Sequence, residues 1–266
     1  MDKSAVNALD VNGLTVKFPM RGGVFGKVQS YFTAVDNVSF SLPQGKILSV
    51  VGESGCGKST LAKSLVGLVP MDRGEYRVFG TKVESGRAAG KRVSDSVQMI
   101  FQDPFSSLNP RQTVEEILTA PLSARGVKFD EARARAVELL ERVSVPVEAL
   151  QKFPHEFSGG QRQRLCIARS LMVRPKILLC DEVTSALDVS VQAQILHLLD
   201  DLKNEFGLSI LFISHDMQVV RALSDEVLVM YFGHVVERGK ADEVLSNPQH
   251  EYTKKLLSCV PTIRRI

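Results

Sequence analysis

The chain has 266 residues, of which 44% are hydrophobic and 24% are charged, a composition that supports a buried core and argues against general disorder. The net charge of +3, without a dense run of Lys or Arg, argues against a nucleic-acid partner. The four cysteines form no C-x-x-C pair, so we expect free thiols in a reducing compartment. We expect no signal peptide and no membrane helix, because no apolar run reaches the roughly 18 residues that a span needs.

The first 70 residues predict three strands and a helix. The strands are expected at 13–18, 34–42 and 46–51, and the Gly-rich stretch 19–30 between the first two predicts a loop. Residues 60–69 have apolar positions at helical spacing, and Pro70 is expected to end that helix. A second Gly-rich stretch, 51–60, therefore lies between a strand and a helix.

The rest of the chain predicts strands over 74–101, then a helical section, then alternating strands and helices. In the helical section Thr113 is a candidate cap, and Val137, Leu140 and Val143 share one face of a helix over 130–143. Another helix, entered through two glycines, is expected over 157–173. The later elements are a buried strand at 176–180, a helix at 190–206, a strand at 209–214, a helix at 216–223 and a strand pair over 226–239.

The stretch "VGESGCGKST" matches the pattern G-x-x-x-x-G-K-[ST] at Gly52, Gly57, Lys58 and Ser59. Glycines let the backbone N–H groups converge on an anion, and the following helix adds the positive end of its dipole. Lys58 can then reach the β- and γ-phosphates of a nucleotide, and the Ser59 hydroxyl can bind Mg²⁺. The alternative is a plain Gly-rich turn, with Cys56 as a small loop residue rather than a redox group.

The predicted nucleotide-binding loop comprises Gly52, Glu53, Ser54, Gly55, Cys56, Gly57, Lys58, Ser59 and Thr60.

Two acidic residues follow the buried strand "KILLC". Asp181 is placed to bind Mg²⁺ through water, and Glu182 to polarise an attacking water. The alternative reading is the preference of acidic residues for helix N-termini, which the accompanying phosphate loop makes less attractive. A switch GTPase is excluded because the chain has no N-K-x-D motif for a guanine base.

The segment "FSGGQRQR" opens a second helix whose N–H groups point toward an anion. One chain already has its phosphate loop, so a second donor cluster suits a head-to-tail pair in which each copy caps the nucleotide of the other. With "SGGQ" between a phosphate loop and "ILLCDE", residues 9–260 resemble the nucleotide-binding subunit of ABC transporters. The one departure is Phe157, where Leu is commoner in that family.

The resemblance implies a fold and further roles. Gln102 in "MIFQDP" resembles the Q-loop glutamine, which binds Mg²⁺, and Asp188 in "SALD" resembles the D-loop residue that crosses to the partner. His215 in "ISHD" resembles the switch histidine that contacts the γ-phosphate. Phe18 is our choice for the aromatic that stacks on adenine, and Tyr31 competes with it. The residues that cap the partner's ATP are Ser158, Gly159, Gly160 and Gln161.

The predicted fold class is α/β, a P-loop NTPase with a mostly parallel sheet, an N-terminal antiparallel β subdomain and an inserted helical subdomain. As one ABC nucleotide-binding domain, the chain would have its ATP-binding core at 9–104 and 173–240, the helical subdomain at 105–172 and a C-terminal segment at 241–266. The implied catalytic residues are Lys58, Gln102, Glu182 and His215, and the implied metal ligands are Ser59, Gln102 and Asp181.

Four segments, "FQDPFSSLNPRQTV", "HEFSGGQRQR", "GHVVERG" and "HEYTKKLLSCVP", resemble the ATPases of dipeptide, oligopeptide and nickel importers. In that group a cysteine-bearing tail can hold an iron–sulfur cluster. Only Cys259 lies near the end of this sequence, so we expect no cluster.

The resemblance therefore implies an ATP- and Mg²⁺-dependent ATPase of an importer, peripheral on the cytoplasmic face of the inner membrane. The solute would be a di- or oligopeptide, with nickel or another small solute as the alternative. Its partners would be a related but different ATPase subunit, two transmembrane permeases and, indirectly, an extracytoplasmic solute-binding protein. The alternative of another class is a soluble ABC ATPase of DNA repair or translation, but the paired cassettes or long coiled-coil insertion typical of those proteins are missing here.

Overall fold

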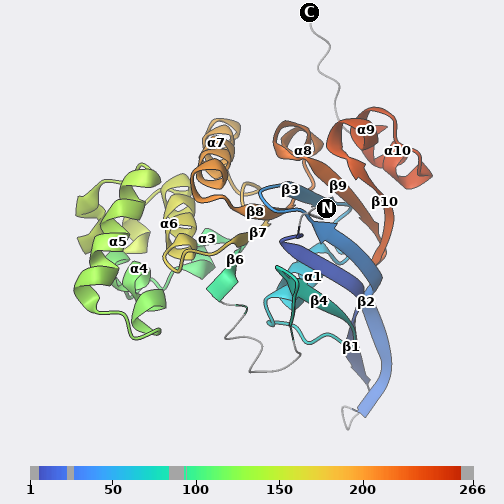
Figure 1. The fold of residues 1–266 in the computed structure, drawn as a ribbon, viewed down its shortest axis with the longest axis horizontal. Helices are drawn as coiled ribbons and strands as arrows, with labels where there is room; N and C mark the ends of the chain where they lie inside the picture. The colour runs from blue at the N-terminus through green and yellow to red at the C-terminus, as the bar shows by residue number, and fades with distance from the viewer. Residues whose placement is uncertain (1–5, 23–26, 84–92, 94, 259–266) are drawn as a thin grey trace, which may run out of the picture. The chain divides into compact units, whose positions relative to one another are not determined.

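The computed structural model describes residues 6–22, 27–83, 93 and 95–258, and Figure 1 shows its fold. The chain forms two compact units: unit 1 comprises residues up to Ser94 together with Ser209 onward, and unit 2 comprises Asp95–Leu208. Within the described ranges, no helix combines the length and the apolar character needed to cross a membrane.

Unit 1 contains an antiparallel sheet in the order β2-β1-β4-β5. Its interior face is apolar: Leu14 and Val16 of one strand and Val35 and Val38 of its neighbour are fully buried or nearly so, as expected for strands that cover a core. The strands of this sheet are β1 (Leu9–Gly22), β2 (Lys27–Leu42), β4 (Arg73–Val78) and β5 (Thr81–Val83).

The prediction of a loop over 19–30 is wrong, because β1 and β2 continue through most of that stretch. Pro19 lies opposite Tyr31, and Gly22 lies opposite Lys27. β4 pairs with β1 only as far as Thr15. Pro19 lies beyond that pairing, so the N–H that proline lacks is not needed for a hydrogen bond to β4. The cross-strand ladder thus overrides the low strand preference of Gly and Pro, and Figure 1 shows the two strands as a long twisted ribbon.

Unit 1 also contains four strands of a mixed sheet, in the order β10-β9-β3-β8. β3 (Ile47–Val51) runs parallel to β8 (Ser209–Ile213) and to β9 (Glu226–Tyr231), and β9 pairs antiparallel with β10 (His234–Lys240). Every residue of β3 and β8 is buried, as expected for parallel strands covered on both faces. The helices of unit 1 are α1 (Lys58–Leu65), α8 (Met217–Leu223), α9 (Ala241–Ser246) and α10 (Glu251–Ser258).

Helix α1 is shorter than the helix predicted over 60–69. Gly67 adopts a left-handed conformation with φ of 76°, so the helix ends before Pro70 is reached. The strand pair predicted over 226–239 is confirmed as β9 and β10.

In unit 2, β6 (Val97–Ile100) pairs in parallel with β7 (Ile177–Asp181), and all of its helical elements except the last, which follows β7, lie between these strands in sequence. Figure 1 shows α4, α5 and α6 side by side, and these three helices contact one another. The helical elements are α3 (Pro104–Ser107), α4 (Val114–Ser123), α5 (Phe129–Arg142), η1 (Val147–Gln151), η2 (Pro154–Glu156), α6 (Gly159–Leu171) and α7 (Val189–Phe206).

Two local predictions in unit 2 have different outcomes. The Thr113 cap is confirmed: its hydroxyl accepts a hydrogen bond from the Glu116 N–H, and the Glu116 carboxylate accepts one from the Thr113 N–H. The predicted face of α5 is rotated, because Val137 is only half-buried while Ala132 and Ala136 are fully buried. The periodicity does not single out the two alanines, because small side chains add little to an apolar pattern. Their small size nevertheless lets neighbouring helices approach closely.

The antiparallel N-terminal sheet, the parallel pairs β3–β8, β3–β9 and β6–β7, and the helices inserted between β6 and β7 confirm the predicted α/β fold class.

We expect Leu139→Ala to lower the free energy of unfolding by about 2–5 kcal/mol, because Leu139 is fully buried where α5 meets its neighbours and its removal leaves a cavity. Leu68→Ala is the matched control: Leu68 is 59% exposed, so its loss should cost less than about 0.5 kcal/mol. Urea unfolding of the whole chain measures both, and equal losses would contradict the assigned core.

Candidate functional site

The predicted phosphate loop connects β3 to α1, with residues 52–57 between Val51 and Lys58. Two of its glycines leave no room for a side chain. A β-carbon on Gly52 (φ 149°) would lie 2.2 Å from the Met230 carbonyl oxygen, and one on Gly57 (φ 106°) would lie 2.2 Å from the Ala34 carbonyl oxygen. The loop therefore closes against β2 and β9 only with glycine at both positions.

Lys58 is the most unusual charged residue of unit 1, because its side chain is only 4% exposed. Its ammonium donates to the carbonyl oxygens of Gly52 (2.8 Å) and Glu53 (2.9 Å) and lies 3.8 Å from the Cys56 sulfur. All three partners are neutral, so none of them compensates the positive charge. A buried, uncompensated ammonium beside a glycine-rich loop is well suited to bind an anion.

The rest of the loop is consistent with this use. Glu53, Ser54 and Gly55 are exposed, while Ser59 and Thr60 lie half-buried in the first turn of α1. The structure favours the small-residue interpretation of Cys56, because its side chain is buried and burial raises the pKa of its thiol. The thiol therefore stays protonated, and poorly nucleophilic, at neutral pH.

His215 lies at the same end of the unit 1 sheet as the phosphate loop. β3 and β8 are parallel with Val50 opposite Ile213, so both strands end together, and His215 follows β8 with its side chain exposed. The next residue, Asp216, caps α8 by accepting from the N–H groups of Gln218 and Val219. Within unit 1 the structure thus brings the phosphate loop and His215 to one edge.

Sequence reasoning missed a residue whose side chain forms a hydrogen bond with the loop. The Tyr252 hydroxyl, from α10, accepts a hydrogen bond of 2.9 Å from the Glu53 N–H. The two residues are 199 positions apart, so no local pattern connects them. The only hint was the segment "HEYTKKLLSCVP", whose resemblance carried no residue role.

Unit 2 brings together Gln102, Asp181 and Glu182. β6 and β7 are parallel with Ile100 opposite Cys180, so the residues after both strands meet at one edge. The Gln102 amide nitrogen donates to a Glu182 carboxylate oxygen at 2.8 Å, and Asp181 ends β7 with only 3% exposure. Sequence reasoning had named Gln102 separately from the pair Asp181 and Glu182, and the strand register explains why Gln102 is their neighbour.

Glu182 has a backbone conformation that non-glycine residues rarely adopt, with φ of 47°. Its carbonyl accepts hydrogen bonds from the N–H and the hydroxyl of Ser185, and this tight turn holds the conformation. Such conformations cost of order 1–3 kcal/mol and cluster at functional sites. The turn aims Glu182 toward Gln102 rather than continuing the direction of β7.

The "SGGQ" segment starts α6 with a reciprocal capping box. The Ser158 hydroxyl accepts from the Gln161 N–H (3.3 Å), and the Gln161 side-chain oxygen accepts from the Ser158 N–H (3.0 Å). Ser158 and Gln161 are exposed, and Gly159 and Gly160 are half-buried, so this helix start is open to an incoming group. Asp188 has a local task as well, because it caps α7 by accepting from the Val191 N–H.

The candidate adenine-stacking residues lie on the ribbon formed by β1 and β2. Phe18 is opposite Phe32, so their side chains share one face, while Tyr31 lies opposite Pro19 on the other face. All three aromatic rings are well exposed: Phe18 by 39%, Phe32 by 53% and Tyr31 by 61%. Phe32 is a third candidate that sequence reasoning missed; it lies between the predicted loop over 19–30 and the strand predicted at 34–42.

The predicted metal ligands fit Mg²⁺ by their chemistry. Ser59, Gln102 and Asp181 offer hydroxyl, amide and carboxylate oxygens, the hard donors that this ion prefers. In the part of the chain that the structure describes, no group of three or more His, Cys, Asp or Glu side chains could hold a metal ion by itself. Cys259 lies outside the described residues, so the expected lack of an iron–sulfur cluster stays a prediction.

Solved structures share this fold. The protein cbiO1 from Clostridium perfringens, part of the ABC transporter complex cbiONQ, matches with a TM-score of 0.78 and 26% identity over 97% of each chain. The ATP-binding cassette MJ0796, solved as a dimer in a post-hydrolysis state bound to ADP and Pi, matches with a TM-score of 0.77 and 28% identity. That match covers 88% of this chain and 98% of the cassette.

Curated relatives are longer than this chain. The glutathione import ATP-binding protein GsiA of Salmonella paratyphi A is 50% identical over 256 residues, which cover 95% of this chain and 41% of the relative. GsiA of Escherichia coli K12 is 48% identical over the same shares of the two proteins. The chain thus spans about two fifths of the length of these relatives.

We expect Gly52→Ala to abolish measurable binding of a fluorescent ATP analogue, because the added methyl group would collide with the Met230 carbonyl and distort the loop. Gly55→Ala is the matched control. It also has a positive φ, of 81°, but open space around it, so it should weaken binding by much less. Similar losses in both variants would show that the approach to Met230 is unimportant.

Two family models match the chain. A model described as ABC transporter matches residues 35–185, which is more than half of the chain, and it includes the phosphate loop and the "SGGQ" helix. A second model, described as Oligopeptide/dipeptide transporter, C-terminal region, matches residues 236–265. The chain therefore belongs to the ABC transporter family and carries that family's ATP-binding domain.

Proposed function

We propose that this chain hydrolyses ATP as one cassette of an ABC importer for small peptides. The observation that carries the proposal is the presence in one chain of two separate helix starts that are suited to bind an anion. One is the phosphate loop with its buried Lys58, and the other is the open, capped start of α6 at Ser158. A single chain needs only one of them to hold a triphosphate, so the second serves the nucleotide of another cassette.

The residues of unit 1 would hold the triphosphate. Lys58 would exchange its two carbonyl partners for the β- and γ-phosphate oxygens, and the loop N–H groups would bind the same phosphates. His215, at the neighbouring strand end, would contact the γ-phosphate. Phe18 would stack on adenine, with Tyr31 and Phe32 as alternatives.

Gln102, Asp181 and Glu182 of unit 2 would serve the hydrolysis. Together with Ser59 of unit 1, Gln102 and Asp181 would hold Mg²⁺, whose charge would offset that of the phosphate oxygens. Glu182 would accept the proton of the attacking water. Gln102 donates to one oxygen of that carboxylate, which ties the orientation of the base to the Q-loop residue.

We expect Glu182→Gln to slow ATP hydrolysis by about 10²–10⁴-fold, the contribution of a well-placed general base, while ATP still binds. The substitution keeps the shape of the side chain and an oxygen that can accept from Gln102, so it removes only the basicity. Phosphate release and binding of a fluorescent ATP analogue measure the two effects. The control Glu131→Gln alters an exposed glutamate of α5 and should hydrolyse ATP normally. Unchanged turnover in the Glu182 variant would reject Glu182 as the base.

The proposed assembly has two cassettes and two permeases. One cassette would close over the γ-phosphate bound by the other with four residues, Ser158, Gly159, Gly160 and Gln161. Asp188 would reach across to the partner cassette. The dimer of MJ0796 bound to ADP and Pi supports such an arrangement for a cassette of this fold. We propose a related but different second cassette, attachment to permeases at the cytoplasmic face of the inner membrane, and an extracytoplasmic binding protein that delivers the solute.

The solute class rests on two findings. The C-terminal region matches the model named for oligopeptide and dipeptide transporters, and the curated relatives are named for import of glutathione, which is itself a tripeptide. Both findings favour a short peptide over nickel.

We expect deletion of this chain from its native cells to abolish uptake of labelled glutathione or dipeptide and to leave Ni²⁺ uptake unchanged. Wild-type chain should restore uptake and the Glu182→Gln variant should not, because transport needs ATP turnover. Loss of Ni²⁺ uptake alone would favour the nickel alternative. If the deletion caused no uptake defect and the chain were absent from the membrane fraction of wild-type cells, a soluble ABC ATPase would be favoured.

A further inference from the structure

The peptide group between Gly52 and Glu53 is held at both of its ends by side chains. Its carbonyl oxygen accepts from the Lys58 ammonium at 2.8 Å, and its N–H donates to the Tyr252 hydroxyl at 2.9 Å. This is the first peptide of the phosphate loop, so its plane sets the direction in which the loop leaves β3.

The two restraints differ in what happens when a nucleotide binds. Lys58 is the group that binds phosphate, so a bound triphosphate competes with the loop carbonyls for its ammonium. Tyr252 belongs to α10 and is not drawn toward the phosphate. Its hydroxyl therefore continues to orient the Gly52–Glu53 peptide when Lys58 turns to the nucleotide.

Tyr252 is itself held firmly. Its side chain is only 7% exposed, and its ring lies 4.1 Å from the Tyr231 ring between centroids. It belongs to an apolar cluster that includes Val51, the last residue before the loop, and Met217, the first residue of α8 after His215. One cluster thus supports the base of the phosphate loop and the helix that follows His215.

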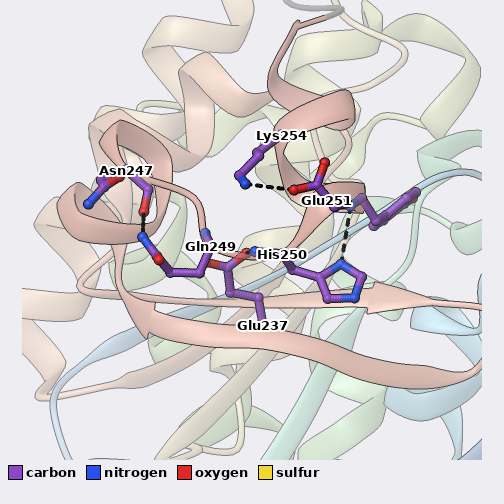
Figure 2. Close-up of polar contacts among 7 residues, drawn as sticks. Glu237, Asn247, Gln249, His250, Glu251 and Lys254 are labelled. Carbon is purple, nitrogen blue, oxygen red and sulfur yellow. Dashed lines mark hydrogen bonds and ion pairs between the residues drawn. The ribbon is translucent and has the colours of Figure 1, made fainter.

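The carboxylate of Glu237 in β10 binds the backbone just before α10, in the region drawn in Figure 2. The Glu237 side chain accepts from the backbone N–H groups of Gln249 (2.7 Å) and His250 (3.1 Å), and the His250 ring nitrogen Nδ1 accepts from the Tyr252 N–H (3.1 Å). Burial alone would raise the pKa of Glu237, but these hydrogen bonds lower it, so the carboxylate stays charged at neutral pH.

We propose that residues 237–258 form a brace for the phosphate loop and that Tyr252 is its positioning residue, which tunes the affinity for the nucleotide phosphates. The chain of contacts runs from Glu237 through the start of α10 to Tyr252 and the Gly52–Glu53 peptide. The match to the C-terminal region of peptide transporters covers this brace but assigns it no task. The proposal rests on ATP binding by the phosphate loop.

The test compares Tyr252→Phe with Tyr76→Phe. Both substitutions remove one hydroxyl from a buried or nearly buried tyrosine that makes one hydrogen bond of 2.9 Å, but the Tyr76 hydroxyl donates to the Leu65 carbonyl at the far end of α1. Because the two changes have similar structural costs, a general loss of stability would affect both variants alike.

We expect Tyr252→Phe to raise the dissociation constants of ATP and ADP about threefold to tenfold, the effect of one hydrogen bond, while Tyr76→Phe leaves them unchanged. ADP should respond like ATP, because the loop holds the α- and β-phosphates that both carry. Hydrogen–deuterium exchange at the Glu53 N–H should speed up only in the Tyr252 variant. Equal affinities in the two variants, or unchanged exchange at Glu53, would overturn the proposal.

A second pair covers the case in which Tyr252→Phe does not fold. Glu237→Gln keeps Tyr252 but weakens the hydrogen bonds to the Gln249 and His250 N–H groups. It should therefore raise the dissociation constants of ATP and ADP by less than Tyr252→Phe does. Its control is Glu251→Gln, an exposed glutamate whose side chain bonds only to Lys254 in the described chain. Affinities unaffected by Glu237→Gln would again overturn the brace. Failure of the wild-type chain to bind ATP would instead defeat the proposed function.

Discussion

The absence of a β-carbon at two positions is the constraint on which this molecule's chemistry depends. Gly52 and Gly57 bring the loop backbone against the carbonyl oxygens of Met230 and Ala34, closer than any side chain allows. That closure buries Lys58 among neutral partners and leaves its charge for an anion. The fold therefore places a buried positive charge among neutral partners at this loop, which suits the phosphate-binding role that we propose for it.

Parallel strands bring the other candidate site residues together. In each unit two adjacent parallel strands end in register, and the residues that follow them are polar: the phosphate loop and His215 in unit 1, and Gln102 and Glu182 in unit 2. Side chains far apart in sequence meet because carboxyl ends of parallel strands share one edge. The sequence motifs predicted the identities of these residues, and the strand register explains their grouping.

Prediction from the sequence failed where the structure depends on contacts between distant segments. The ribbon through Pro19 and Gly22 was predicted as a loop, because local preferences cannot reveal that a partner strand runs alongside. Tyr252 escaped notice for the same reason: its hydroxyl meets the phosphate loop only because α10 packs on the apolar cluster beside β9. Both errors concern pairings between segments, and neither concerns the type of a strongly periodic element.

The sequence by itself determined the fold class, the alternation of strands and helices as far as β10 and the match to the phosphate-loop pattern, because these depend on residue spacing along the chain. The helices α9 and α10 were not predicted. The family followed from the same motifs, and the family models agree with it. Tertiary structure alone decided which residues touch: the bond from Gln102 to Glu182, the strained turn at Glu182 and the support of the loop by Tyr252. Such contacts depend on strand register and helix packing, and those are set by the whole folded chain rather than by any short stretch of it.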